Sequence, residues 1–316
     1  MAVVILCFFA GIVLLCLGSE WMVRGAAGLA LSFRIRPVIV GLTVVAFGTS
    51  APELMVSLVA AVKGSSGVSL GNILGSNVAN LGLVMGLSAL IRPLSVEPSL
   101  LQREMPFMLA VTLLFWIICM DCRIGRFDGI LLLSCLAAFL LMGFFTARGA
   151  ATDILEGAER GLGIRLWRGF QVVAGTAGLV VGANWMVQSA IHIAKALGLS
   201  EVFIGLSIVA VGTSLPELAT SVVAGIKGQA DISIGNVVGS NIFNICLVIG
   251  MVGVFNPMDT DIRLHRFEFP ALVVISAFLL LFSRTGRRLN RWEGLFFFLG
   301  FWAFVWVSYG LSRPAG

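Results

Sequence analysis

Two glutamates at matched positions carry the most distinctive chemistry in this sequence. The motif G-T-S-x-P-E occupies residues 48–53 and again residues 212–217, each time in the middle of an apolar segment, and it ends in Glu53 or Glu217. A carboxylate at the centre of a bilayer costs on the order of 3 kcal/mol or more, and two carboxylates that face each other repel. A bound cation relieves both costs, so the pattern predicts a cation site. For either glutamate alone, a protonated and hydrogen-bonded core residue is the plainer interpretation.

The prolines of this motif predict how the backbone takes part. Pro52 and Pro216 each stand one residue before a glutamate. A proline inside a helix removes a backbone donor and clashes with the preceding turn, so we expect both helices to break. The break should free carbonyls near Ala46 to Thr49 and near Ala210 to Thr213. In lipid a freed carbonyl needs a new partner, and a dehydrated cation is a suitable one.

A second motif, G-N-x-x-G-S-N, is also present twice, at residues 71–77 and 235–241. Its glycines form G-x-x-x-G, which is typical of a helix-packing face. Packing does not explain the polar side chains that accompany the glycines at membrane depth, because such groups are costly in lipid. The second motif therefore predicts further site residues as well as close helix contact.

The polar residues of the second motif fit two kinds of role. Ser76 and Asn80 are four residues apart and share a helix face, so they could add neutral oxygens to the glutamates. Asn72 and Asn77 could instead hydrogen-bond the broken helix ends, and both roles stay open for them. The counterparts of Ser76 and Asn80 in the second copy are Ser240 and Asn244.

The predicted ligands are carboxylate, hydroxyl, amide and carbonyl oxygens. All-oxygen sites suit hard cations such as Na⁺ and Ca²⁺ rather than zinc or copper, and Mg²⁺ fits less well because it sheds its water reluctantly. Two carboxylates are neutralised by one Ca²⁺ or by two Na⁺ or H⁺, so these loads compete. Cys119 and Cys122 form a lone C-x-x-C, for which a disulfide or metal site is the weaker alternative. We expect His192 and His265 at the surface and no resident cofactor.

The composition requires a membrane setting for these residues. Of 316 residues, 59% are hydrophobic and 12% are charged, whereas a soluble domain carries roughly 25% charged residues. The net charge of +5 does not indicate a nucleic-acid partner, because the arginines lie in short loops between apolar runs. The apolar start lacks a basic region, so we expect a retained helix rather than a cleaved signal peptide. The lipid bilayer is the expected surrounding.

Ten apolar segments give the expected topology of an all-α membrane protein. Thirteen Lys and Arg residues lie in the loops after odd-numbered segments and seven lie on the other side. The positive-inside rule then places the odd loops in the cytoplasm and both termini outside. The segments run over residues 2–32, 37–62, 68–91, 104–120, 127–146, 166–197, 202–226, 231–255, 266–283 and 293–312.

An internal repeat relates the two halves. Residues 41–80 align with residues 205–244 without a gap, at an offset of 164, with 22 of 40 positions identical. Five spans precede the second copy, and five is odd, so the second copy enters the membrane upside down, as in many secondary transporters. We predict two inverted five-helix repeats at 1–146 and 166–316, joined by a cytoplasmic connector at 147–165. A duplicated structural bundle without a transport role is the alternative.

These residues resemble the sodium/calcium exchanger family within the cation/calcium antiporter superfamily, of the prokaryotic type without a regulatory domain. The G-T-S-x-P-E and G-N-x-x-G-S-N blocks are similar to its two repeats, and the likeness covers nearly the whole chain. The resemblance implies that the long first and sixth helices slide across the core. It implies that the site residues are Glu53, Glu217, Thr49, Thr213, Ser50, Ser214, Ser76, Ser240, Asn80 and Asn244, with carbonyls from Ala46 and Ala210.

The resemblance predicts an antiporter, not an enzyme, that exchanges Ca²⁺ for Na⁺ across the inner or plasma membrane. Several family members carry aspartate where this chain has Asn244, and in the potassium-dependent branch that aspartate is linked to K⁺ use. Asparagine at this position argues against K⁺ dependence. The rival hypotheses are a proton-coupled calcium antiporter that uses the same glutamates, and a channel or non-transporting scaffold.

Overall fold

The computed structural model describes residues 2–33, 36–149, 161–196 and 210–312, and these residues are mainly helical. Before residue 150 the helices are α1 (Ala2–Phe33), α2 (Pro37–Val40), η1 (Gly41–Val45), α3 (Ala46–Thr49), α4 (Ala51–Val62), α5 (Ser66–Ala79), η2 (Asn80–Val84), α6 (Met85–Ile91), η3 (Leu100–Glu104), α7 (Met105–Ile118), η4 (Cys119–Asp121) and α8 (Arg126–Gly149). After residue 160 they are α9 (Leu162–Ala196), α11 (Ala210–Thr213), α12 (Leu215–Ile226), α13 (Ala230–Phe243), η6 (Asn244–Ile249), α14 (Gly250–Phe255), η7 (Ile262–His265), α15 (Glu268–Arg284) and α16 (Arg291–Ser312).

Helices fall on all ten expected segments, although residues 202–209 of the seventh lie outside the described part. In the described part, seven helices are long and apolar enough to cross a membrane, or eight if the bent pair Pro37–Thr49 and Ala51–Val62 is one span. Helices dominate because the bilayer core offers no water to satisfy exposed backbone groups. The chain is therefore a multi-pass, mostly helical membrane protein.

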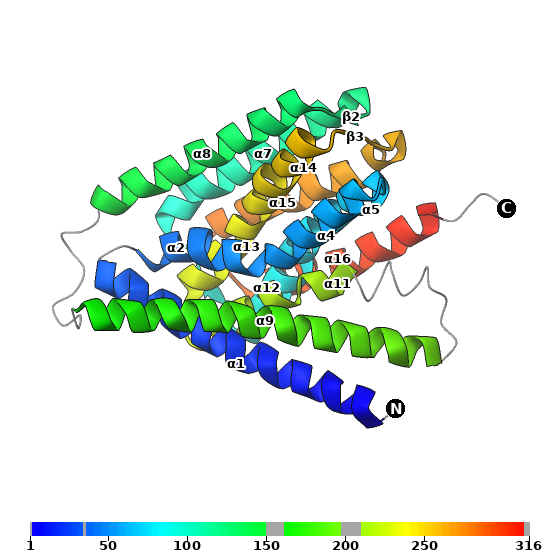
Figure 1. Cartoon of the computed structure of the whole chain (residues 1–316). Coiled ribbons are helices and arrows are strands. Elements are labelled where there is room, and N and C mark those ends of the chain that lie inside the picture. Colours follow the sequence, from blue (N-terminus) through cyan, green and yellow to red (C-terminus); the bar gives the residue numbers. More distant parts are fainter. Residues whose placement is uncertain (1, 34–35, 150–160, 197–209, 313–316) are drawn as a thin grey trace.

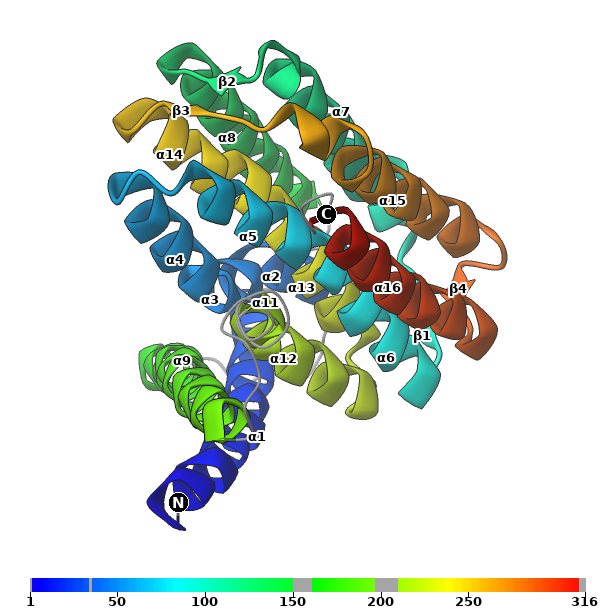
Figure 2. The same cartoon turned by 90° about the vertical axis from the view of Figure 1, so that its right-hand side faces the viewer.

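The helices α1 and α9 are the longest, with 32 and 35 residues. At about 1.5 Å per residue they extend about 48 and 52 Å, well beyond a hydrocarbon core of about 30 Å. Helices of this length must tilt to match the bilayer. Figures 1 and 2 show α1 and α9 side by side along one flank of the bundle.

Glycines allow α1 and α9 to pack in close contact. A Cβ built on Gly18 would lie 2.8 Å from the carbonyl oxygen of Gly175, and a Cβ on Gly175 would lie 2.6 Å from the backbone nitrogen of Met22. Gly11 and Gly182 approach each other in the same way. Backbones this close exclude any larger side chain, so these glycines fix how the two helices are paired.

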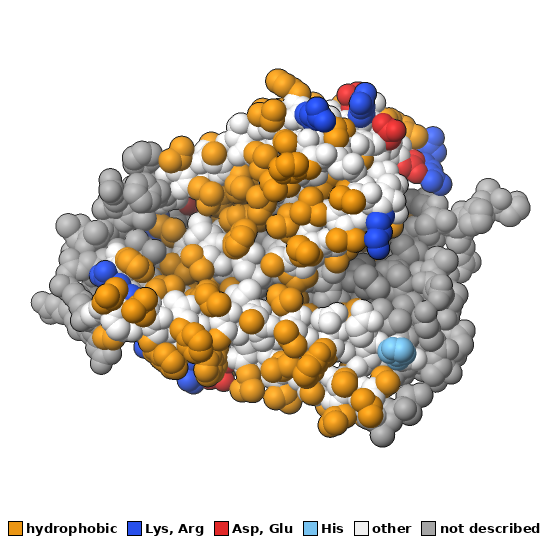
Figure 3. Space-filling model, viewed as in Figure 1, with side chains coloured by type: hydrophobic (Ala, Val, Ile, Leu, Met, Phe, Trp, Pro, Cys, Tyr) orange, Lys and Arg blue, Asp and Glu red, His pale blue; other side chains and the backbone are white. Residues whose placement is uncertain are grey.

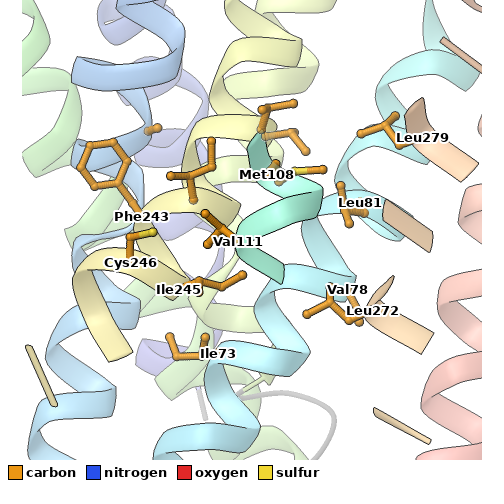
Figure 4. Close-up of a cluster of buried hydrophobic side chains, with 14 of the residues drawn as sticks. Ile73, Val78, Leu81, Met108, Val111, Phe243, Ile245, Cys246, Leu272 and Leu279 are labelled. Atoms are coloured by element: carbon orange, nitrogen blue, oxygen red, sulfur yellow. The ribbon is translucent and has the colours of Figure 1, made fainter. Parts of the chain in front are cut away.

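A continuous apolar core lies between α5, α7, α13 and α15. Ile73 and Val78 of α5 lie in one cluster with Val111 of α7, Ile245 of η6 and Leu272 of α15 (Figure 4). A second cluster joins α1 and α9 to α12 through side chains such as Met22, Leu179 and Leu215. The helices α1 and α9 thus pack on the bundle through a cluster that is distinct from the main core.

Two small antiparallel sheets connect loops from the two halves. Their strands are β1 (Leu94–Ser95), β2 (Arg123–Ile124), β3 (Met258–Asp259) and β4 (Arg288–Leu289). The first sheet pairs Leu94 with Leu289, and the second pairs Arg123 with Asp259. Each sheet therefore joins a strand from before residue 150 to one from after residue 160.

Side chains on the surface follow the membrane pattern. On the face in Figure 3, hydrophobic side chains cover the broad middle, and Lys, Arg, Asp and Glu gather toward its two ends. Large apolar side chains such as Phe9, Val173 and Trp306 are more than half exposed. An exposed apolar belt between charged ends matches lipid tails between two water layers.

Candidate cation site

Both motif-bearing helices break where the prolines predict. The helix α3 ends at Thr49 and α4 begins at Ala51, with Ser50 at φ −81° and ψ 6° between them. The equivalent break between α11 and α12 falls at Ser214, with φ −87° and ψ 7°. The first break bends its helix pair by 44°. Each proline then sits in the first turn of the new helix, where its missing N–H costs nothing.

Glu53 and Glu217 lie in these first turns and are fully buried. The hydroxyl of Ser50 donates a hydrogen bond to Oε1 of Glu217 at 3.1 Å, and the hydroxyl of Ser214 donates to Oε1 of Glu53 at 3.4 Å. The two glutamates are thus held by crossed bonds, each from the opposite half of the chain. The N-terminus of a helix also stabilises negative charge near its first turn.

One carboxylate oxygen of each glutamate has no hydrogen-bond partner. These atoms are Oε2 of Glu53 and Oε2 of Glu217, and both are buried. A buried polar atom without a partner is costly, and a charged one more so. Oxygen atoms in this state are suited to contact a cation, whose charge and coordination would replace the missing partners.

Threonine and serine hydroxyls from the two halves also meet in pairs. The Thr49 and Ser240 hydroxyls are 3.3 Å apart, and those of Thr213 and Ser76 are 3.4 Å apart. The structure thereby brings each predicted threonine next to the predicted serine of the other half. The neutral oxygens lie at the same junction as the glutamates.

The expectation of an open Ala46 carbonyl was wrong. This oxygen accepts the N–H of Ser50 at 3.0 Å and the hydroxyl of Thr49 at 3.3 Å. The last turn of α3 ends with these two bonds to the Ala46 oxygen, two residues before Pro52. Pro52 has no N–H, so the carbonyl that loses its helical donor is that of Gly48, four residues earlier. Ala210 begins α11, and its side chain lies outside the described set.

Asn80 and Asn244 are both fully buried. Each begins a π-helical segment, η2 or η6, where the widened turn changes the direction of the side chains. The amide nitrogen of Asn244 donates to Oδ1 of Asn77 at 3.1 Å, whereas neither amide atom of Asn80 has a partner. Both residues thus keep unused hydrogen-bonding capacity in the core.

Two asparagines outside the predicted ligand set prove central to the geometry. Asn72 donates to Ser57 Oγ at 2.9 Å and to the carbonyl of Glu53 at 3.3 Å, and its Oδ1 accepts from Thr213 at 3.4 Å. Asn236 repeats the pattern with Ser221 at 2.9 Å, the Glu217 carbonyl at 3.4 Å and Thr49 at 3.0 Å. Of the two roles left open for Asn72, the contacts match the hydrogen bonding of a broken helix end.

Cysteine and histidine stay outside this junction. Cys119 and Cys122 are both free thiols, so the disulfide alternative for the C-x-x-C was wrong. Within the described ranges, His, Cys, Asp and Glu form no group of three that could hold a metal ion. His265, expected at the surface, is half-buried, stacks on Phe269 and accepts the indole N–H of Trp116 at 3.0 Å.

Two broken helices that bring carboxylates, hydroxyls and amides together inside an apolar bundle define a membrane transporter of cations. The chain belongs to the sodium/calcium exchanger family. The family described as sodium/calcium exchanger protein matches residues 3–145 and 169–310. Members of this family are antiporters of calcium and other cations rather than enzymes.

Individual relatives and a solved structure are similar to this chain over nearly its whole length. The chain is 32% identical over 339 residues to the sodium/calcium exchanger MaX1 of Methanosarcina acetivorans, covering 95% of this chain and 96% of that protein. It is 34% identical over 314 residues to the inner membrane protein YrbG of Escherichia coli, covering 96% and 95%. The solved sodium/calcium exchanger of Methanococcus jannaschii superposes with a TM-score of 0.85 at 30% identity, covering 96% of this chain and 98% of that structure.

Proposed function

We propose that the chain is a secondary antiporter that exports Ca²⁺ in exchange for Na⁺ entering down its gradient. The observation that carries this proposal is the crossed pair of buried glutamates, each with one unpartnered carboxylate oxygen. Two carboxylates bring two negative charges, which one Ca²⁺ or two Na⁺ would balance. Because the loads compete for the same charge, binding of one favours release of the other.

We assign the cation ligands to the eleven residues named from the sequence other than Ala46, with the glutamates at the centre. The hydroxyls of Thr49, Thr213, Ser76 and Ser240 lie at the same junction and would supply neutral oxygens. The chemistry of this set suits a hard cation. Ca²⁺ and Na⁺ are substrates in this proposal, and the antiporter needs no resident cofactor.

We further propose that ten membrane spans form two inverted five-helix repeats, with residues 147–165 as a cytoplasmic connector. The offset of 164 relates the helix breaks at Ser50 and Ser214 and the π-segments that begin at Asn80 and Asn244. It also relates β1 to β3, and each pairs with a strand of the other half. We place the chain in the inner or plasma membrane, and the positive-inside rule puts both termini outside.

The test is ion flux into proteoliposomes that hold the purified protein. Vesicles loaded with Na⁺ and diluted into Na⁺-free medium with ⁴⁵Ca²⁺ should accumulate calcium, and a pH gradient alone should drive none. Uptake driven by the pH gradient would support the proton-coupled alternative and overturn Na⁺ coupling. Protein that gives no gradient-driven uptake, while remaining folded, would overturn antiport altogether.

A further inference from the structure

Asn72 on α5 and Asn236 on α13 each connect three elements through one amide group. The amide nitrogen of Asn72 bonds the glutamate-bearing helix of its own half, through the Glu53 carbonyl and Ser57, while its oxygen accepts from Thr213 of the other half. Asn236 makes the same three bonds in mirror fashion, ending on Thr49. All three functions of each amide are therefore in use.

These bonds join the same parts of the two halves as the crossed serine bonds do. Thr49 and Ser50 are neighbours, and Thr49 bonds Asn236 while Ser50 bonds Glu217. Asn236 in turn holds the backbone carbonyl of Glu217. Each broken helix is thus fixed against the opposite glutamate at two points, one direct and one through an asparagine.

We propose that Asn72 and Asn236 are positioning residues that set the spacing between the two carboxylates, and so the preference for one divalent over two monovalent ions. One Ca²⁺ needs both carboxylates on a single ion at about 2.3–2.6 Å. Two Na⁺ at separate positions tolerate a wider gap. Loss of either asparagine therefore weakens Ca²⁺ binding more than Na⁺ binding. This inference rests on the proposed exchange.

A double-mutant cycle tests whether Asn72 positions the site through its bond to Thr213. Asn72→Ala removes all three bonds, and the loss of even one buried hydrogen bond corresponds to about a five-fold change. We therefore expect this variant to raise the KM for Ca²⁺ by at least about five-fold and to change the KM for Na⁺ less. Thr213→Val removes the hydroxyl that bonds Asn72 and pairs with Ser76, so the two changes together should raise the KM by less than the product of their separate effects. The matched control is Asn72→Ala with Thr49→Val, a pair that shares no bond and should be additive.

Two outcomes would overturn this role of Asn72. One is an additive effect of Asn72→Ala and Thr213→Val, as in the control pair, and the other is an equal loss of affinity for Ca²⁺ and Na⁺. Failure of the proposed function is recognised separately in the wild type. If the wild type moves Ca²⁺ on a pH gradient, Na⁺ coupling is wrong, and the same cycle read on Ca²⁺ alone still decides whether Asn72 and Thr213 are coupled.

An independent observation concerns an ion pair between α1 and the end of α12. Lys227 Nζ lies 3.0 Å from Glu20 Oε1, and Arg24 lies 2.5 Å from the same oxygen one turn along α1. The helix α1 packs along α12 in this structure. The pair therefore ties the flank helix to a glutamate-bearing helix.

The equivalent pair cannot form in the other half. The offset of 164 relates Lys63 to Lys227 but relates Asn184 to Glu20, and asparagine carries no charge. Lys63 and Asn184 are both exposed, and α9 has no contact with α4 comparable to that between α1 and α12. The pair of helices that has the ion pair, α1 and α12, is thus also the pair in which the flank helix packs on the glutamate-bearing helix.

We infer that the Glu20–Lys227 pair is a latch that favours the conformation with α1 against α12 over its mirror conformation with α9 against α4. Hydrogen–deuterium exchange of the full-length protein in nanodiscs tests this without transport. Glu20→Gln should raise the exchange protection of α4 relative to that of α12 by about two- to five-fold, the effect of losing a partly exposed ion pair.

The mirror positions provide controls of both kinds. Lys63→Gln should leave the protection ratio unchanged, because Lys63 faces no acid at position 184. Asn184→Glu should create the mirror pair with Lys63 and shift the ratio in the same direction as Glu20→Gln. Equal effects of Glu20→Gln and Lys63→Gln, or an unchanged ratio in Asn184→Glu, would overturn the latch.

Discussion

The hydroxyl of Ser50 donates to the carboxylate of Glu217 at 3.1 Å across a sequence separation of 167 residues. Its mirror bond, from Ser214 to Glu53, is longer at 3.4 Å. Each serine is the single residue between two helices, so its hydroxyl is placed by the break itself. The two breaks thus hold each other's glutamate, and neither half can shift without moving both charges.

Loss of the Ser50 hydroxyl should weaken Ca²⁺ transport more than loss of the Ser214 hydroxyl. A hydrogen bond to a charged group contributes about 1.5–3 kcal/mol, and such a bond weakens with length. We expect Ser50→Ala to raise the KM for Ca²⁺ about ten-fold or more, and Ser214→Ala to raise it less. Uptake of ⁴⁵Ca²⁺ at graded concentrations measures both.

The control for the serine variants is Ser134→Ala. Ser134 is partly exposed on α8 and donates only to the carbonyl of Ile130 within its own helix. Its removal should leave the KM unchanged. Equal KM values in Ser50→Ala and Ser134→Ala would contradict the role of the crossed bond.

Neutral replacement of either central glutamate should abolish Ca²⁺ uptake. Glu53→Gln and Glu217→Gln keep the shape of the side chain and remove one of the two charges that balance Ca²⁺. Each variant should remain folded, because a neutral amide is less costly than a carboxylate in a buried site. Proteoliposome flux together with size-exclusion chromatography separates lost transport from lost fold.

Glu268→Gln is a matched control for these variants. Glu268 also lies in a membrane helix, α15, and is half-buried, but it accepts a hydrogen bond from Ser308 of α16 and not from a residue of the broken helices. Its replacement should retain uptake. Ca²⁺ transport by the Glu53→Gln, Glu217→Gln double variant would refute the assignment of the site.

The sequence predicted the helix breaks and the glutamate pair because proline and duplication leave local, readable signals. Pro52 and Pro216 located the breaks to within two residues. The expectation of an open Ala46 carbonyl was wrong because its partners, the Ser50 N–H and the Thr49 hydroxyl, depend on the backbone geometry of the last turn of α3. That geometry does not follow from the residue types alone.

Contacts between the two halves were the harder part to predict. Asn236 and Thr49 are 187 residues apart, and only the folded chain shows that they bond at 3.0 Å. The one sequence signal was the repeated asparagine of the second motif, which fitted ligand and structural roles equally. The two-residue strands carry no periodic pattern, so their pairing, such as Leu94 with Leu289, had no signal at all.

The glycine contact between α1 and α9 predicts stability changes of opposite sign for two Gly→Ala variants. Gly18→Ala would place a Cβ 2.8 Å from both the Gly175 oxygen and the Leu179 nitrogen, and should destabilise the fold by about 1–3 kcal/mol. Gly300→Ala on α16 meets no atom within 4 Å and should stabilise by up to about 1 kcal/mol through helix propensity. Melting temperatures in detergent measure both, and a fall of equal size in the two variants would contradict the close packing.

Asn244→Asp should give Ca²⁺ transport a requirement for an additional monovalent cation. The fold should tolerate this change, because Asn77 Nδ2 has no partner, and a flipped Asn77 amide can donate to the new carboxylate in place of the present 3.1 Å bond. The site then carries three negative charges, so one Ca²⁺ leaves one charge unbalanced. We expect uptake by Asn244→Asp to rise with KCl in the external medium, whereas wild-type uptake stays independent of KCl. Asn244→Ser removes the amide without adding charge, so KCl dependence in that variant, or its absence in Asn244→Asp, would show that the charge at position 244 does not set the ion requirement.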